Sequence, residues 1–179
     1  MPLSDFINTQ YHSFPQLRLA ILPFSVPANI ARIDNEHEGW GNEIAWDMQA
    51  QILASGKVSI VEVFNPREWP GKHEEFYTGN HTAISLAQAA GYDLLLVGVV
   101  EPFKAATQAS AVAKLIDVNS SVTVWYGRSQ TGKREFNTRH GDPFFITSSH
   151  RPDDMPSSYL KEDLTRCLVE NVLSDNPVP

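Results

Sequence analysis

Tyr92-Asp-Leu-Leu-Leu-Val-Gly-Val-Val100 is the most apolar run in the chain. A short, nearly continuous apolar run bounded by polar residues and a glycine is typical of a strand that is buried in a sheet. We expect it to be the central strand of the fold, and we assign the other elements outward from it.

Two helix–strand units precede this run. A helix is expected over residues 81–90, because Ala83, Leu86, Ala87 and Ala90 fall on one face, and Gly91 ends it. Before that helix, residues 58–64 (VSIVEVF) are rich in β-branched side chains and predict a strand.

The earlier unit has the same form. Apolar residues recur every fourth position in Trp40, Ile44, Met48 and Ile52, which predicts a helix over residues 41–54 that ends at Ser55-Gly56. The first strand is expected within residues 17–24 (LRLAILPF), another nearly continuous apolar run.

Two strands are expected after the central run, over residues 112–118 and 122–126, where side chains alternate in character. Asn119-Ser120-Ser121 between them is suited to a hairpin turn. A last helix is expected over residues 158–174, and its inward side chains are Leu160, Leu164, Cys167, Leu168 and Val172.

The predicted order is β-α-β-α-β-β-β-α. Strands joined through helices should be parallel and strands joined by tight turns antiparallel, so we expect an α/β fold with helices packed on a mixed sheet. The 179 residues are enough for about one domain, which we place at residues 17–174. An N-terminal arm (1–16), an irregular segment within the domain (135–157) and a tail (175–179) complete the predicted organisation.

Composition restricts the possible functions. Fourteen basic residues against 21 acidic ones give a net charge of −7, which disfavours binding to nucleic acid or to an anionic membrane surface. Cys167 is the single cysteine, so no internal disulfide is possible, and its apolar helical context predicts a core residue rather than a reactive thiol. No apolar stretch is long enough to span a bilayer. The start has no signal-peptide pattern, although a natural precursor could have carried one that is trimmed away here.

One segment matches part of a phosphate-binding motif. Residues 127–134 (GRSQTGKR) fit G-x-x-x-x-G-K after a strand, but Arg134 stands where a magnesium-binding hydroxyl is required, and the following residues make a poor helix. We interpret the segment as a surface loop.

The six histidines show no metal-ligand spacing, and no G-x-S-x-G is present. We therefore expect no enzyme activity, cofactor or metal.

An acidic segment leads into the first predicted helix. It contains Asp34, Glu36, Glu38 and Glu43, and Asp47 follows within the helix. Negative charge at a helix N-terminus is favoured by the helix dipole, which is one explanation of the cluster. A surface that attracts a cationic ligand or partner is the other.

The four tryptophans divide into two groups. We expect Trp46 and Trp125 to pack in the core, whereas Trp40 and Trp69 border loops, where aromatic side chains often serve interfaces.

Four segments of the chain are informative when they are taken together. They are Leu19–Phe24 (LAILPF, similar to "(I/V)AVLPF"), Ile52–Val58 (ILASGKV, similar to "L-x-x-S-G-+-(F/V)"), Ala89–Gly98 (AAGYDLLLVG, similar to "A-x-x-x-G-A-D-Y-(V/L)-(L/V)-x-G") and Leu115–Val118 (LIDV, similar to "L-(V/I)-D-(V/A)"). Over about residues 17–128, their order and spacing resemble those of a known superfamily, the TolB N-terminal-like and CsgG-like envelope proteins.

The resemblance implies a three-layer α/β domain and a noncatalytic role in the Gram-negative envelope. The short, single-domain PelC type fits best, which implies a periplasmic homo-oligomeric ring that is anchored to the inner leaflet of the outer membrane by a lipid. Such a ring would assist export of a cationic exopolysaccharide, with a secretion channel as a further partner. An LpoB-like module that activates a cell-wall synthase is the alternative.

The chain also departs from the pattern of this superfamily. No lipid-attachment cysteine is visible near the start, and Asn119-Ser120-Ser121 replaces the usual "T-G" after "L-(V/I)-D". The PelC type has a membrane-facing aromatic residue near its C-terminal helix. Phe144, Phe145 and Tyr159 are candidates for that role, and we group them with Trp40 and Trp69 as candidate membrane- or interface-facing aromatics.

Overall fold

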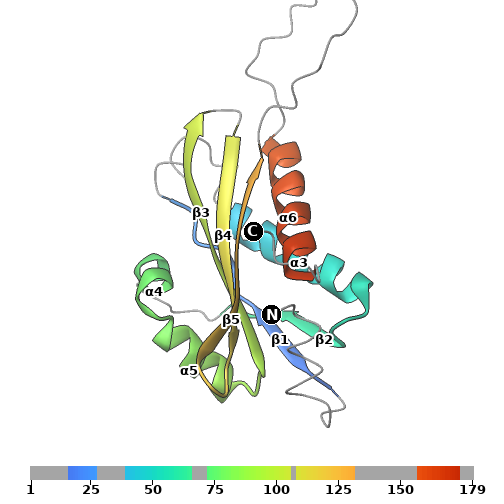
Figure 1. Ribbon diagram of the computed structural model, residues 1–179, viewed down its shortest axis with the longest axis vertical. Helices are drawn as coiled ribbons and strands as arrows, with labels where there is room; N and C mark the ends of the chain where they lie inside the picture. Colours follow the sequence, from blue (N-terminus) through green and yellow to red (C-terminus); the bar gives the residue numbers. More distant parts are fainter. Residues whose placement is uncertain (1–15, 28–38, 66–71, 106–107, 132–156, 174–179) are drawn as a thin grey trace, which may run out of the picture.

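The computed structural model describes residues 16–27, 39–65, 72–105, 108–131 and 157–173. A five-stranded sheet lies between two layers of helices, with α4 and α5 on one side and α3 and α6 on the other (Figure 1). In chain order the elements are β1 (Arg18–Ile21), α3 (Trp40–Ser55), β2 (Ile60–Val63), α4 (Lys72–Thr78), α5 (His81–Ala89), β3 (Leu94–Ala105), β4 (Gln108–Asp117), β5 (Val122–Thr131) and α6 (Ser157–Leu173). The predicted α/β class with a mixed sheet is confirmed.

The strand order is β2-β1-β3-β4-β5. β1 pairs in parallel with both β2 and β3, whereas β3, β4 and β5 pair in antiparallel fashion. The strands that are separated by helices are therefore parallel, and those joined by short connections are antiparallel, as the sequence predicted. The run that begins at Leu94 lies at the centre of the sheet.

The central strand contributes to two separate cores. Leu94 and Leu96 point to the side of the sheet that α3 and α6 cover, whereas Leu95 and Val97 point to the side of α4 and α5. Successive strand side chains alternate between faces, so a strand covered on both sides must be apolar at every position. This requirement explains why residues 94–100 form the most apolar run of the chain, and all seven are buried.

Asp93, within the segment Ala89–Gly98, connects three strands through hydrogen bonds. The backbone N–H of Arg18 donates to Asp93 Oδ2 at 2.9 Å, and the backbone N–H of Asp93 donates to the Arg18 carbonyl at 3.0 Å. The Val118 N–H donates to the Asp93 carbonyl at 2.9 Å. One residue thus fixes the starting positions of β1 and β3 and the end of β4 relative to one another.

α4 was not predicted. It has seven residues, and Phe76 is its buried apolar side chain, at 2% exposure. A helix with so short an apolar face leaves no periodic signal in the sequence. Lys114 on β4 holds this helix to the sheet, because its Nζ donates to the Phe76 carbonyl at 2.5 Å and lies 4.4 Å from the centre of the Phe76 ring.

The three antiparallel strands are longer than predicted. β3 and β4 continue as a paired ladder through Glu101 and Ser110, and β5 continues to Thr131. The prediction of a surface loop for residues 127–134 is therefore wrong for residues 127–131, which pair with Ala109–Ala113 of β4. Polar side chains end an apolar pattern without ending a strand when one face of the sheet is open to water. Residues 132–134 lie outside the described chain.

Gly127 has a structural role in β5. A Cβ atom at this position would lie 2.2 Å from Cζ2 of the Trp125 indole. The missing side chain thus leaves room for the tryptophan, which packs against the core as predicted.

Among the described helices, none combines the length and the apolar character that crossing a membrane requires.

Candidate functional site

The predicted acidic surface is described in part. Asp34, Glu36 and Glu38 lie outside the described residues, and Glu43 lies in the first turn of α3. Glu43 Oε2 is 2.5 Å from Nζ of Lys161 on α6, and these side chains are 41% and 15% exposed. The charge of Glu43 is thus compensated within the chain, and the ion pair with Lys161 connects α3 to α6.

Asp47 lies one turn further along α3, beside the same lysine. Burial raises the pKa of the Asp47 carboxyl above its ordinary value of 3.8. Lys161 opposes this rise, and the carboxylates of Glu162 and Glu43 add to it. Lys161 at the α3–α6 boundary therefore pairs with Glu43 and also acts on the carboxyl of Asp47.

The candidate aromatic residues differ in where the structure places them. Trp40 is 2% exposed and packs in the core formed with α3 and α6, so the prediction that it faces a membrane or a partner is wrong for the described fold. It occupies the same helical face as Ile44 and Met48, which explains its burial. Trp69, Phe144 and Phe145 lie outside the described residues, as does the side chain of Tyr159 on α6.

The prediction that Trp46 packs in the core is also wrong, because this residue is 56% exposed. It is two positions away from both Ile44 and Met48, so helical geometry turns it away from the sheet. Leu53, seven residues further on, is also exposed, at 42%. Position in the helix, rather than hydrophobicity, is the signal that could have placed both side chains on the outer face.

Exposed tyrosines occupy the opposite side of the sheet. Tyr126 on β5 is 60% exposed and pairs directly with Lys114, whose ammonium contacts α4. Tyr77 on α4 is 62% exposed, and its ring lies 5.2 Å from that of Phe76. Sequence reasoning missed this surface because α4 itself was not predicted.

A polar network lies on the same face, further along the long strands. Glu101 of β3 accepts from Ser110 Oγ at 2.6 Å and from Nη2 and Nε of Arg128 at 2.6 and 3.1 Å. The three side chains come from three neighbouring strands. The carboxylate charge of Glu101 is thus matched by the guanidinium of Arg128, and the network as a whole carries little net charge.

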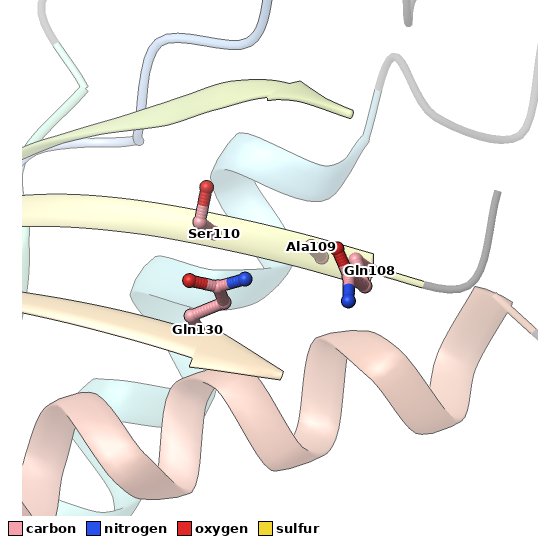
Figure 2. A pocket seen from close by; sticks show the side chains of 4 residues that line it. All are labelled: Gln108, Ala109, Ser110 and Gln130. Carbon is pink, nitrogen blue, oxygen red and sulfur yellow. The ribbon is translucent and has the colours of Figure 1, made fainter. Parts of the chain in front are cut away.

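A shallow depression adjoins this network. It is lined by Gln108, Ala109, Ser110 and Gln130, and Figure 2 shows Ser110 and Gln130 on adjacent strands at the end of the sheet. Two amides and a hydroxyl provide both donors and acceptors of hydrogen bonds. Such a lining can contact neutral polar groups, including sugar hydroxyls, and it contains no charged residue.

A serine and a histidine meet in the segment that follows β1. Ser25 Oγ lies 3.4 Å from His73 Nδ1; Ser25 is partly buried and His73 is exposed. Within the described part of the chain, no carboxylate is hydrogen-bonded to His73, and no three metal-ligating side chains gather in one place. A catalytic serine normally requires a histidine that a third group orients.

The comparisons with known proteins bear on the fold. No protein-family model matches the chain, and no curated protein matches it. The solved structure of a PelC dodecamer from Paraburkholderia phytofirmans is similar at 17% identity and a TM-score of 0.50, covering 90% of this chain and 89% of that chain. Hypothetical protein CT253 from Chlamydia trachomatis matches at 14% identity and TM-score 0.48, covering 90% and 99%. The LpoB C-terminal domain from Salmonella enterica matches at 12% identity and TM-score 0.42, covering 74% and 96%. At this level of identity, the likeness to PelC establishes a shared fold, which is the fold implied by the four sequence segments.

Proposed function

We propose that this chain is a noncatalytic protein of the bacterial envelope that forms a homo-oligomer and assists the export of a cationic exopolysaccharide. The observation that carries the proposal is the fold shared with a PelC dodecamer over nine-tenths of both chains. The dodecameric state of that neighbour supports self-association of this chain. The proposed location is the periplasm, at the outer membrane, with a lipid anchor supplied by the natural precursor.

The charge balance supports a cationic ligand. A net charge of −7 creates a negative field that concentrates cations near the protein. Glu43 is already paired with Lys161, so we assign attraction of the polymer to Asp34, Glu36 and Glu38. The amides and hydroxyl of the depression at Gln108, Ser110 and Gln130 offer additional contacts to sugar hydroxyls.

A binding measurement with a defined polymer tests this proposal. Partially deacetylated poly-N-acetylglucosamine is the cationic probe, and the fully acetylated polymer is its neutral counterpart. We expect binding of the cationic polymer by isothermal titration calorimetry, weakened by added salt because ions screen exposed charges. Binding of neither polymer, or equal binding of both at all salt concentrations, would contradict the proposal.

A matched pair of variants locates the binding surface. Glu36→Gln with Glu38→Gln and Glu74→Gln with Glu170→Gln both change the net charge from −7 to −5, since each removes two carboxylates. Glu74 and Glu170 are exposed on α4 and α6. The first pair should weaken binding about tenfold, and the second pair should change it less, because it only reduces the overall field. Equal effects would show that the acidic segment is not the site.

A further inference from the structure

Two segments of the chain match the acceptor motif for N-linked glycosylation, in which serine or threonine follows an asparagine at the second position. They are Asn80-His81-Thr82 and Asn119-Ser120-Ser121. The motif is short enough to arise by chance, so its surroundings in the fold decide whether a modifying enzyme has access to it. The structure describes both segments and places them in very different surroundings.

The first motif is inaccessible, because Asn80 is 2% exposed at the junction of α4 and α5. Its backbone N–H donates to the Glu75 carbonyl at 2.9 Å, and its carbonyl accepts from the Ile84 N–H at 2.9 Å. Asn80 thus connects the end of one helix to the start of the next. An enzyme could reach its side-chain amide only after this junction had opened.

The second motif lies in the hairpin turn between β4 and β5. Asn119, Ser120 and Ser121 are all exposed, and Asp117–Val122 is the last pair of the ladder before the turn. Among the described residues, no hydrogen bond involves the side-chain amide of Asn119. A large hydrophilic group on this amide would extend into water without disturbing the pairing of the strands.

An acidic residue also distinguishes the second motif from the first. Asp117 stands two positions before Asn119, whereas Thr78 stands two positions before Asn80. Bacterial oligosaccharyltransferases require an aspartate or glutamate at this position. In the folded turn, Asp117 Oδ1 accepts from the Asn119 N–H at 3.3 Å and Oδ2 accepts from Ser120 Oγ at 2.6 Å. The acid and the acceptor asparagine therefore belong to one exposed turn.

We propose that Asn119 is an N-glycosylation site for a bacterial oligosaccharyltransferase, with an oligosaccharide on polyprenyl pyrophosphate as the donor. A bond forms between Asn119 Nδ2 and C1 of the first sugar while the bond from C1 to the pyrophosphate oxygen breaks. Polyprenyl pyrophosphate leaves with the bonding electron pair, and the amide proton passes to a base of the enzyme. Modification in the cell requires the proposed periplasmic location, whereas the chemical assignment of the site does not.

A glycan at Asn119 would stand far from the polar depression at the other end of the long strands. Ser110 in the depression and Asp117 at the turn are seven residues apart on β4, which corresponds to about 23 Å along a strand. The modification therefore leaves the contacts that we propose for sugar hydroxyls unobstructed.

Transfer to the purified, folded chain tests the assignment directly. The reaction contains a bacterial oligosaccharyltransferase and its lipid-linked oligosaccharide, and mass spectrometry of the intact chain and of its peptides locates the product. We expect one glycan, at Asn119, on the wild-type chain and none on Asn119→Gln.

Two serine variants of the same turn form a matched pair. Ser121→Ala removes the hydroxyl of the motif, so transfer should slow by more than about a hundredfold. Ser120→Ala keeps the motif and removes the hydrogen bond that holds Asp117 in the turn, so transfer should become about fivefold faster. Circular dichroism melting checks that both are folded. Ser121→Gly replaces Ser121→Ala if needed, because glycine readily adopts the φ of +59° found at this position.

A further variant separates exposure from sequence. Thr78→Asp combined with Asn119→Gln gives Asn80 the same extended motif and removes the exposed one, and Thr78 is itself exposed. We expect no glycan on this folded variant, because Asn80 remains buried.

Three results would overturn the inference: no glycan on the wild-type chain when a reference acceptor protein is modified in the same reaction, equal transfer to Ser120→Ala and Ser121→Ala, or a glycan at Asn80 in the folded variant. None of them bears on self-association or on the binding of cationic polymer, so the proposed function stands or falls by its own tests.

Discussion

The position of a residue within its helix decided its role more than its chemical type did. Trp40 and Trp46 lie on the same helix, six residues apart, yet Trp40 is buried and Trp46 is 56% exposed. The four-residue spacing that predicted Ile44, Met48 and Ile52 as core residues also includes Trp40 and excludes Trp46. The sequence therefore contained the information to place both residues, and the preference of tryptophan for the core or for loop borders was the weaker guide.

Asp47 provides a prediction at the same scale. Its pKa is raised in the folded state by burial, so between the ordinary aspartate value and the raised value the native state binds more protons than the unfolded state. The contribution of Asp47 to the free energy of unfolding therefore falls as the pH rises through that window. Asp47→Asn removes the charged form, so we expect the variant to gain stability relative to wild type at pH 7.

Urea denaturation of both proteins at pH 7 and pH 3 measures this effect. At pH 3 the carboxyl is largely protonated in both states, so the difference between variant and wild type should shrink. A difference that is the same at both pH values, or larger at pH 3, would show that the charge of Asp47 is not destabilising. The matched control is Glu170→Gln, which removes a carboxylate from the exposed surface of α6. A control at Gln49 on α3 itself is unsuitable, because Gln49 Nε2 donates a hydrogen bond to the Val61 carbonyl at 2.8 Å.

At the scale of elements, long periodic segments were predictable and short or polar ones were not. α3 was expected over residues 41–54 and spans Trp40–Ser55, and Gly56 ends it in the left-handed conformation at φ +69°. α4 was missed because one buried phenylalanine does not form a repeat of apolar residues at helical spacing. The outer halves of β3, β4 and β5 were missed because Glu101, Ser110 and Arg128 are polar, although they are hydrogen-bonded to one another across the sheet.

The attachment of α4 to the sheet gives a prediction at this scale. Lys114 contributes both a hydrogen bond to the Phe76 carbonyl and a contact with the Phe76 ring. Lys114→Met keeps most of the side-chain stem but loses the ammonium. Amides of α4 should then exchange with solvent about tenfold faster, since loss of one charged hydrogen bond costs on the order of 1–2 kcal/mol.

Hydrogen exchange followed by mass spectrometry resolves this change. Arg128→Met on β5 is the matched control, because Arg128 contacts Glu101 rather than α4. The β3 amides at residues 94–100 should remain equally protected in both variants. Unchanged exchange in α4 of Lys114→Met would show that burial of Phe76 alone holds the helix in place.

At the scale of the whole molecule, the mixed sheet and its central strand followed from the alternation of helices and apolar strands, whereas the strand order β2-β1-β3-β4-β5 was not predicted. The candidate site followed much less closely. Of the predicted acidic residues, the structure describes Glu43, which is paired with Lys161, and of the predicted aromatics it describes the side chain of Trp40, which is buried. The exposure of the apolar side chains Trp46, Leu53, Tyr77 and Tyr126 depends on which faces of the elements remain uncovered. That property is fixed by three-dimensional packing, and it cannot be assigned before the partner of each face is known.

Sedimentation equilibrium of the wild-type chain, over a wide range of concentrations, tests the central claim that this protein works as an assembly of its own copies. The account predicts an average mass that rises with concentration beyond that of two copies of the 20.0 kDa chain. A mass of 20.0 kDa at every concentration, both with and without the cationic polymer, would contradict it and would favour a monomeric module that acts on a partner enzyme.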